Sequence, residues 1–317
     1  TLESDIEKIK DFYLQRGYVD VKINSTQVLI SEDKNFIEIS INLTEGDLFE
    51  FGNYIISDQD IVKNEFLDKS IKFYKGQFFS RKKLLASISK MEKFFKDLGY
   101  MDAQIIPVPD FDRVNNIVNF EFKIIEGRRY TVRRINISGN NNTLDKVIRR
   151  EMRQFESSWY SEKNISRSKE RIEKLGFFSE VKIDIKPVID EFDDLVDVDI
   201  NVVERQTGSL TLGVGYSSDE HVLLNAGISQ PNFLGSGNAL SLNVNSGKVN
   251  TLYAVSYTNP SYTNTGISRG YDVYKRDTDV SSLSVTRYKT STLGGGVRYG
   301  VPITEYDDIN FGFAYED

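Results

Sequence analysis

The sequence contains no cysteine, a single histidine and a single tryptophan among its 317 residues. The absence of cysteine excludes disulfides, thiol chemistry and cysteine-ligated metals. His221, beside Asp219 and Glu220, gives neither a catalytic triad nor a set of zinc ligands, and we interpret it as a solvated loop residue. We therefore predict that the protein is not an enzyme and uses no metal or cofactor.

Long apolar runs are also missing, and no stretch approaches the roughly 18 consecutive apolar residues of a transmembrane helix. A transmembrane β-barrel is still allowed, because its strands place an apolar residue only at every second position. One acidic cluster lacks the spacing of a calcium loop and is interpreted as a polar turn between two strands. It comprises Asp190, Glu191, Asp193 and Asp194. The glycine-rich segments 235–237 and 294–296 precede no phosphate-binding helix, so they are not phosphate loops.

Basic residues are outnumbered by acidic ones, 40 to 47, and the formal net charge is -7. Phosphate backbones bind basic faces, so this balance argues against a nucleic-acid partner. Local basic clusters do occur, and we interpret them as solvated or protein-contacting faces. They comprise Arg128, Arg129, Arg133, Arg134, Arg149, Arg150 and Arg153.

The sequence does contain an internal repeat. Gly17, Gly99 and Gly176 each follow a predicted helix and precede an aromatic residue. A glycine just past a helix end permits the left-handed backbone that closes the helix. A second landmark, a glutamate at a turn, recurs in step with the glycines at 45–46, 126–127 and 204–205. The period of about 80 residues indicates tandem structural repeats.

Each period contains the same predicted elements. In the middle copy, one apolar helix stripe follows three- and four-residue steps along Leu84, Ile88, Met91, Phe95 and Leu98. Strictly alternating apolar residues predict strands at 37–43, 118–124 and 196–202. A further strand and then a helix follow each glutamate turn, with the strands at 49–57 and 130–138. The unit is therefore β-α-α-β-β, a small α+β domain with helices on one face of a three-stranded sheet.

The first copy lacks the first strand and first helix of this unit. The chain opens in a predicted helix at 2–16, and no signal peptide precedes Thr1. We therefore expect a cut or processed piece of a longer protein. Tandem units of this kind expose sheet edges, and such an edge can accept a strand from another chain.

The pattern of apolar residues in the sequence changes after residue 205. Helical stripes give way to strict alternation, for example at 210–216, 240–245, 253–258 and 309–315. Three features favour a transmembrane barrel over a soluble sandwich. Strands run about 9–12 residues, and aromatic residues lie at strand ends. Short turns such as 301–307 alternate with longer, more polar connections such as 277–282. We expect about seven strands between Thr207 and Tyr315. Seven open strands cannot close a large barrel in lipid, so we expect the barrel to continue beyond Asp317.

Together these features resemble the BamA family of outer-membrane β-barrel assembly factors, and the repeats resemble POTRA domains. The resemblance covers essentially the whole chain. Its most specific stretches are 132–140, 149–154, 169–178, 204–209, 213–216 and the segment QPNFLGSG at 230–237. The implied domains are the end of a third POTRA domain (1–47), a fourth (48–127), a fifth (128–205) and the first barrel strands (206–317).

The resemblance implies a cofactor-free protein of the outer membrane, with periplasmic repeats that receive unfolded outer-membrane proteins and fold them into the bilayer. Implied partners are those substrates, accessory lipoproteins and outer-membrane lipids. An incoming strand would pair with the first barrel strand, whose glycines make it pliable. The residues of that strand are Gly208, Ser209, Leu210, Thr211, Leu212, Gly213, Val214, Gly215 and Tyr216. A simpler explanation is that Gly213 and Gly215 only relieve crowding inside the barrel.

The same resemblance places part of a lipoprotein interface at the end of the first helix of the last repeat. The candidate residues are Arg149, Arg150, Glu151 and Arg153. A solvated helix end is the alternative for each of them. Two other functions also stay open, namely a related outer-membrane pore that exports a single substrate and a non-catalytic periplasmic scaffold.

Overall fold

A computed structural model describes residues 1–31, 35–57, 64–188, 194–218, 220–282 and 288–317. The chain divides into two compact units. The first comprises Thr1–Arg133, Glu156–Asn164 and Pro187–Val196, and the second comprises Arg134–Phe155, Ile165–Lys186 and Asp197–Asp317. Among the described residues, no helix is both long enough and apolar enough to cross a membrane.

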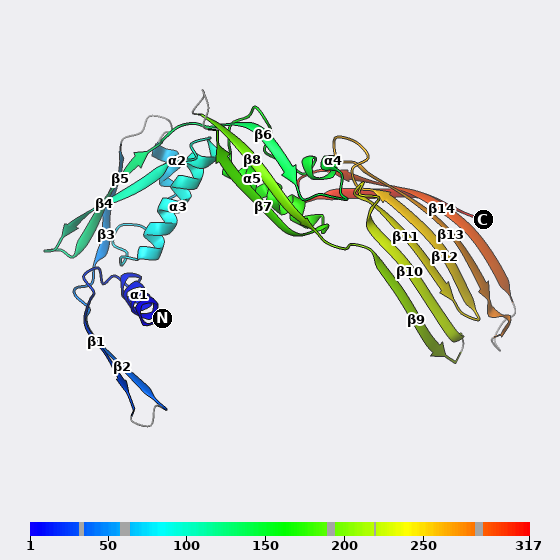
Figure 1. Cartoon of the computed structure of the whole chain (residues 1–317), viewed down its shortest axis with the longest axis horizontal. Coiled ribbons are helices and arrows are strands. Elements are labelled where there is room, and N and C mark those ends of the chain that lie inside the picture. The colour runs from blue at the N-terminus through cyan, green and yellow to red at the C-terminus, as the bar shows by residue number, and fades with distance from the viewer. Residues whose placement is uncertain (32–34, 58–63, 189–193, 219, 283–287) are drawn as a thin grey trace. The chain divides into compact units, whose positions relative to one another are not determined.

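The first two repeats lie in the first unit (Figure 1). The opening segment contains α1 (Leu2–Leu14) and an antiparallel hairpin of β1 (Lys22–Ile30) and β2 (Ile37–Thr44). The middle repeat runs β3 (Glu50–Ser57), α2 (Asn64–Asp68), α3 (Arg81–Asp97), β4 (Gln104–Asp112) and β5 (Ile117–Ile125). Its sheet has the order β3-β5-β4, with β3 parallel and β4 antiparallel to β5. This is the predicted β-α-α-β-β order.

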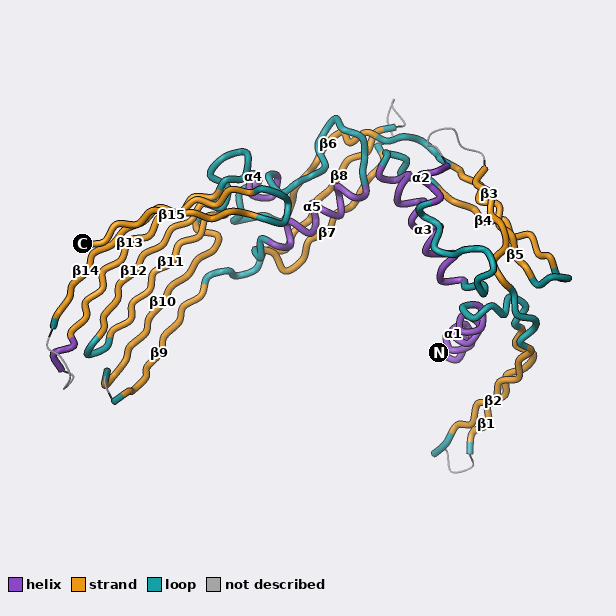
Figure 2. Tube along the Cα trace, turned by 180° about the vertical axis from the view of Figure 1, so that it is seen from behind, coloured by secondary structure: helices purple, strands orange, loops and turns teal. Residues whose placement is uncertain are grey.

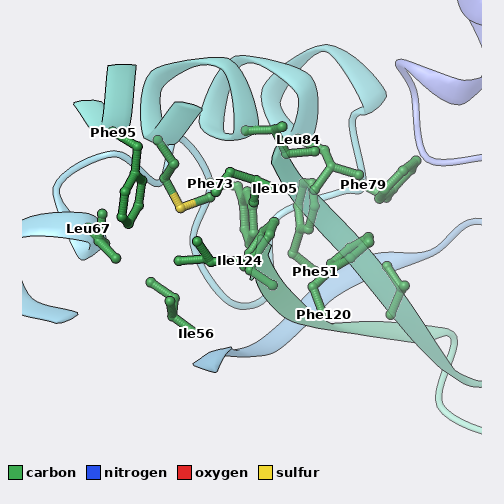
Figure 3. Close-up of a cluster of buried hydrophobic side chains, with 14 of the residues drawn as sticks. Phe51, Ile56, Leu67, Phe73, Phe79, Leu84, Phe95, Ile105, Phe120 and Ile124 are labelled. Carbon is green, nitrogen blue, oxygen red and sulfur yellow. The ribbon is translucent and has the colours of Figure 1, made fainter. Parts of the chain in front are cut away.

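The core of the middle repeat lies between α3 and the sheet (Figure 3). The predicted stripe is confirmed at Leu84, Ile88, Met91 and Phe95, which are all buried, whereas Leu98 is half-buried. Aromatic rings fill the space beneath the helix, and the Phe51 ring stacks on that of Phe73 at 3.9 Å. Burial of this size is what holds a small α+β unit together, because each fully buried large apolar side chain contributes about 1.5–3 kcal/mol.

The repeat glycines have the predicted conformation. Gly17, Gly99 and Gly176 have φ angles of +104°, +106° and +72°. These left-handed values end α1, α3 and the corresponding helix of the last repeat without the steric cost that a side chain would add. The aromatic residue that follows packs back on its helix, as the 6.3 Å separation of the Phe95 and Tyr100 rings shows.

The last repeat has the same element order. It contains β6 (Thr131–Ser138), α4 (Asp145–Arg149), α5 (Glu162–Lys174), β7 (Phe178–Pro187) and β8 (Leu195–Glu204), with the sheet order β6-β8-β7. The alternation predicted for β8 is confirmed, since Val196, Val198 and Ile200 are all 0% exposed. Asp194 lies in a turn, as predicted for the acidic run, and the other three acidic residues of that run lie outside the described residues.

A single antiparallel sheet follows the last repeat (Figure 2). Its strands are β9 (Ser209–Ser217), β10 (His221–Phe233), β11 (Asn238–Ser246), β12 (Asn250–Asn259), β13 (Ser268–Asp279), β14 (Lys289–Pro302) and β15 (Asp308–Glu316). The order is sequential from β9 to β15, and the seven strands match the predicted number. Apolar residues on one face, such as Leu212 and Phe313, are each 74% exposed, as expected where the surroundings are apolar.

Two local predictions differ from the structure. His221 is the first residue of β10 rather than a loop residue, and its φ of +57° places it at the tight start of that strand. Asp277 and Asp279 belong to β13, so the connection predicted at 277–282 begins later than the sequence indicated. In both cases a polar strand end has the composition of a loop, and hydrogen bonding to the neighbouring strand decides where the strand stops.

Candidate functional site

The first strand of the sheet, β9, is an edge strand. It pairs along its length with β10, from Ser209 opposite Ser229 to Ser217 opposite His221, and no other described strand lies on its far side. The predicted strand 208–216 is therefore shifted by one residue, and Gly208 lies in the linker before it. Leu210, Leu212, Val214 and Tyr216 are 67–79% exposed. An edge of this kind offers unpaired backbone N–H and C=O groups to another strand.

The two glycines of β9 are not required by crowding in this sheet. A methyl group at Gly213 would lie 3.7 Å from Asn225 Cβ, and one at Gly215 would lie 3.7 Å from Leu223 Cβ. Both are ordinary van der Waals distances. Glycine at these positions therefore lowers the stiffness of the strand without being needed for its packing on β10.

The start of β9 is fixed to the last repeat through a short linker, residues 205–208. Arg205 donates through Nε to the carbonyl of Gly176 at 2.6 Å, and its backbone N–H donates to the carbonyl of Phe177 at 3.0 Å. Further along, the Gln230 amide donates to Thr207 Oγ1 at 3.3 Å. A methyl group at Gly208 would lie 2.3 Å from Gln230 Oε1, so a side chain at this position would have to displace the Gln230 amide.

Glu204, the last residue of β8, binds the loop that precedes α4. Its carboxylate accepts hydrogen bonds from the backbone N–H of Thr143 at 2.6 Å and from the Nδ2 of Asn142 at 2.9 Å. Burial alone would raise the pKa of this carboxyl group, but the hydrogen bonds from Thr143 and Asn142 outweigh it and the pKa is lowered. The charged form is thus the one that holds the loop.

The same loop receives the turn between β10 and β11. Asn232, which is only 9% exposed, donates through Nδ2 to Thr143 Oγ1 at 2.8 Å and accepts from the backbone N–H of Gly237 at 2.8 Å. The carbonyl of Gly235 accepts from the backbone N–H of Leu144 at 2.9 Å. The motif at 230–237 is therefore a docking turn that joins the sheet to the last repeat.

A second attachment uses the turn between β14 and β15. Glu305 accepts a hydrogen bond from Arg153 Nε at 2.7 Å on one carboxylate oxygen and from Arg167 Nε at 2.8 Å on the other. The Arg167 guanidinium also lies over the Tyr306 ring, 4.7 Å from its centroid. Hydrogen bonds from the two arginines, Arg153 first, lower the pKa of Glu305. One carboxylate thus joins two segments of the repeat to the sheet.

The predicted lipoprotein-contact residues lie at this same junction. Arg149 is the last residue of α4 and donates through Nε to Asp145 at 3.0 Å, whereas the other three candidates follow the helix. Glu151 accepts from Arg171 at 2.7 Å, and Arg153 is bound to Glu305. These residues therefore form contacts within the chain, and their proposed role toward a lipoprotein stays a prediction.

Sequence reasoning missed most of the junction. Glu305 and Arg153 are 152 positions apart, and Asn232 and Thr143 are 89 apart. The segments around 149–154, 204–209 and 230–237 were singled out as motifs, but nothing in their spacing indicates that they meet. Glu305 lies in the predicted short turn 301–307, and nothing in the sequence of that turn indicates a partner for the carboxylate.

Within the ranges that the structure describes, no three acidic or histidine side chains are grouped closely enough to hold a metal ion. His221 lies 3.4 Å from Lys248 Nζ and stacks against Tyr216. What the site offers is backbone pairing at β9 and polar docking at its start.

Comparison with known families decides the identity of this architecture. The model for the POTRA repeat, described as a surface antigen variable number repeat, matches residues 1–46, 49–127 and 130–205, which is more than half of the chain. The Omp85 superfamily domain matches residues 232–317. An outer membrane protein assembly factor BamA from Neisseria meningitidis is 38% identical over 98% of the chain. The chain belongs to the BamA family. This membership confirms the predicted fold class and the prediction of a non-catalytic protein.

Solved structures of BamA proteins agree with this family. BamA from Haemophilus ducreyi lacking POTRA domains 1–3 has 33% identity and a TM-score of 0.72, covering 85% of this chain and 51% of that one. POTRA domains 3–5 of Haemophilus influenzae BamA give 29% identity and a TM-score of 0.57, covering 64% of this chain and 80% of that one. The family places β9–β15 in the outer membrane and the repeats in the periplasm.

The chain spans less than the full length of the curated relatives that it matches. It covers 39% of the Neisseria BamA and 51% of a BamA from Buchnera aphidicola, to which it is 28% identical.

Proposed function

We propose that this protein folds and inserts outer-membrane proteins by adding their strands to the edge of β9, after the periplasmic repeats have received them unfolded. The observation that carries the proposal is the composition of β9, whose two glycines are not required by its packing on β10, in a chain whose relatives are named as assembly factors. Substrates would be recognised mainly through their backbone, because edge pairing uses N–H and C=O groups that every sequence has.

The composition of β9 supports this role. Its glycines leave room on one face, and its apolar residues lie exposed on the other. During assembly of a substrate barrel, β9 must pair readily with the first substrate strand and must later release it. A strand with few packing contacts of its own is suited to both steps, since little side-chain packing must be broken when its partner is exchanged.

The test uses the absence of cysteine from the sequence. Single cysteines at Ser209 or Thr211 in the full-length protein, with a single cysteine in the last strand of a substrate, should give disulfide cross-links during assembly. The matched control is Thr251→Cys in β12, a strand paired on both sides. Equal cross-linking at β9 and β12 would contradict strand addition at this edge.

Two other functions are distinguished by liposome experiments. An assembly factor should speed the folding of an unrelated barrel protein, whereas an exporter should conduct ions and secrete a single substrate without that acceleration. A purely periplasmic scaffold would require residues 206–317 to fold cooperatively in water. The exposed apolar face of β9 argues against the periplasmic scaffold, because a water-soluble sheet would leave that face uncovered.

We also propose the numbering of the repeats and one partner. Residues 1–47, 48–127 and 128–205 are assigned as the third to fifth POTRA domains, in line with the likeness to a three-domain POTRA fragment. Arg149, Arg150, Glu151 and Arg153 are proposed to border the contact with an accessory lipoprotein. Binding of that lipoprotein should weaken in Arg149→Ala, and an unchanged affinity would remove Arg149 from the interface.

A further inference from the structure

The second unit contains two pockets, of about 460 Å³ and about 590 Å³. The larger of the two is lined by basic residues. One wall comes from α4 and the segment after it and contains Lys146, Arg149, Arg150 and Arg153. The opposite wall comes from the ends of β11 and β12 and the turns beside them, with Asn238, Asn259 and Asn264 among its residues. No carboxylate is among the residues that line it.

Arg150 is the decisive residue of this pocket. Its side chain is 21% exposed, and its Nε is buried without a hydrogen-bond partner in the part of the chain that the structure describes. Its Nε forms an ion pair with Glu151 Oε1 at 3.4 Å, but this contact does not have the geometry of a hydrogen bond. The guanidinium packs against the docking turn, since a methyl group at Gly237 would lie 2.7 Å from Arg150 Nη2. A buried N–H donor without a hydrogen-bond partner costs free energy, so the Nε of Arg150 favours an acceptor from a bound group.

The other arginines nearby are bound differently. Arg153 and Arg167 share Glu305, and Arg171 is bound to Glu151 at 2.7 Å. Lys146 has no ion pair with the residues that the structure describes, whereas Arg150 has only the 3.4 Å contact with Glu151. The pocket therefore combines a half-buried arginine and an exposed lysine, both lacking an anionic hydrogen-bond partner, with neutral amide donors on the facing wall.

We propose that this pocket binds a phosphate group, held by Arg150 and Lys146. Planar guanidinium forks bind phosphate oxygens with two parallel hydrogen bonds, and a lysine adds a point charge. The volume is sufficient for a phosphate ester as well as for the free ion. Two sources fit this chemistry, the headgroup of an anionic phospholipid and inorganic phosphate. The pocket lies at the ends of β11 and β12, where headgroups meet a transmembrane sheet, which favours the lipid.

A bound phosphate would also join the repeat to the sheet. Its oxygens would accept from Arg150 on one wall and from the asparagine amides on the other. This role is independent of strand addition at β9, because the pocket contains no residue of that strand.

The experiment titrates the detergent-purified, full-length protein with short-chain phosphatidylglycerol, short-chain phosphatidylcholine or inorganic phosphate, and counts bound molecules by native mass spectrometry. We expect saturable binding of phosphatidylglycerol that weakens about tenfold in Arg150→Gln and is restored in part by Arg150→Lys. Lys146→Gln, an exposed position that does not disturb the core, should weaken binding as well. The matched control is Lys182→Gln, whose lysine is paired with Asp184 at 2.9 Å outside the pocket.

The outcomes separate the two sources. Binding of inorganic phosphate that depends on Arg150 and Lys146, without binding of phosphatidylglycerol, would support a site for the free ion. Equal binding in wild type, Arg150→Gln and Lys146→Gln would overturn the proposal. So would tighter, Arg150-dependent binding of an acidic peptide, since the site would then be a protein contact.

Discussion

Two adjacent phenylalanines show how strongly the position of a residue decides its contribution. Phe79 is 7% exposed and lies 5.1 Å from the Phe51 ring, whereas Phe78 is 56% exposed. Their identical chemistry makes them a matched pair. The hydrophobic effect and ring contacts act only on the side chain that leaves water.

Replacing Phe79 by alanine should destabilise the middle repeat by about 3–5 kcal/mol, because it removes buried ring contacts and leaves a cavity. Phe78→Ala should change stability by less than about 0.5 kcal/mol. The free energy of unfolding by urea measures both. Similar losses for the two variants would mean that the core does not lie where Figure 3 places it.

The spacing of apolar residues was sufficient to predict such buried side chains. Three- and four-residue spacing predicted Ile88 and Met91 in α3, and alternate positions predicted Val198 in β8. These patterns are local, and burial on one face follows directly from the geometry of the element. The partners of charged residues could not be predicted in the same way. Arg153 could have paired with any exposed carboxylate, and only the folded chain brings Glu305 to it.

The ion pair of Glu305 gives a prediction with a defined pH dependence. Because hydrogen bonds from Arg153 and Arg167 lower the pKa of Glu305 below 4.5, its contribution is present above pH 4.5 and is lost as the pH falls through the lowered pKa. Glu305→Gln should therefore lower the melting temperature slightly at pH 7, by about 1–3 °C, since the pair is partly exposed.

Differential scanning fluorimetry across pH tests this expectation. The difference between wild type and Glu305→Gln should close when the wild-type carboxylate becomes protonated. Glu173→Gln is the control, because Glu173 belongs to an exposed pair with Lys169 at 3.9 Å. A gap between wild type and Glu305→Gln that persists at pH 2 would assign the effect to something other than charge.

At the scale of elements, the turn between β10 and β11 differs from the turn between β12 and β13. Gly235 and Gly266 both have left-handed φ angles, +68° and +87°. A methyl group at Gly235 would lie 1.9 Å from the Asn142 carbonyl oxygen, whereas the nearest atom at Gly266 would be 3.7 Å away. The turn at Gly235 is therefore packed against the last repeat, whereas the turn at Gly266 leaves room for a methyl group.

Gly235→Ala should therefore displace the docking turn, whereas Gly266→Ala should cost only the backbone strain of about 1–2 kcal/mol. We expect Gly235→Ala to increase the rate of amide hydrogen exchange at Leu144, whose N–H donates to the Gly235 carbonyl. Gly266→Ala should leave that rate unchanged. Faster exchange in both variants would indicate general loosening of the sheet rather than loss of docking.

The sequence indicated this turn as a motif but not its partner. Its glycines predict a tight turn from local rules. The loop that it contacts, 140–144, is fixed by Glu204 from a different strand, so three separate segments must be folded before the site exists. Local sequence patterns do not indicate which distant segments come into contact.

At the scale of the whole molecule, the last repeat and the seven-stranded sheet are attached at several points within the second unit. Glu204 fixes the loop that receives the docking turn, whereas Glu305 itself joins the sheet to Arg153 and Arg167, and both carboxylates have lowered pKa values. The two attachments are far apart in sequence and share no residue, so their effects should be approximately additive.

The double variant Glu204→Gln with Glu305→Gln should loosen the repeat from the sheet more than either single change. Spin labels on Lys182 in β7 and Thr251 in β12 would report this as a broader distance distribution in the full-length protein. The single variants should show intermediate widths. An unchanged distribution in the double variant would mean that the apolar contacts of α4 suffice for the attachment.

The linker between β8 and β9 has a mechanical consequence. A chain of about four residues spans at most roughly 14 Å when fully extended, and here Arg205 and Thr207 are both tied down. The linker can therefore lengthen very little when a polypeptide pulls on β9. The load passes at once into β8, whose side chains form the centre of the last repeat, so tension at the membrane would be felt in the periplasm.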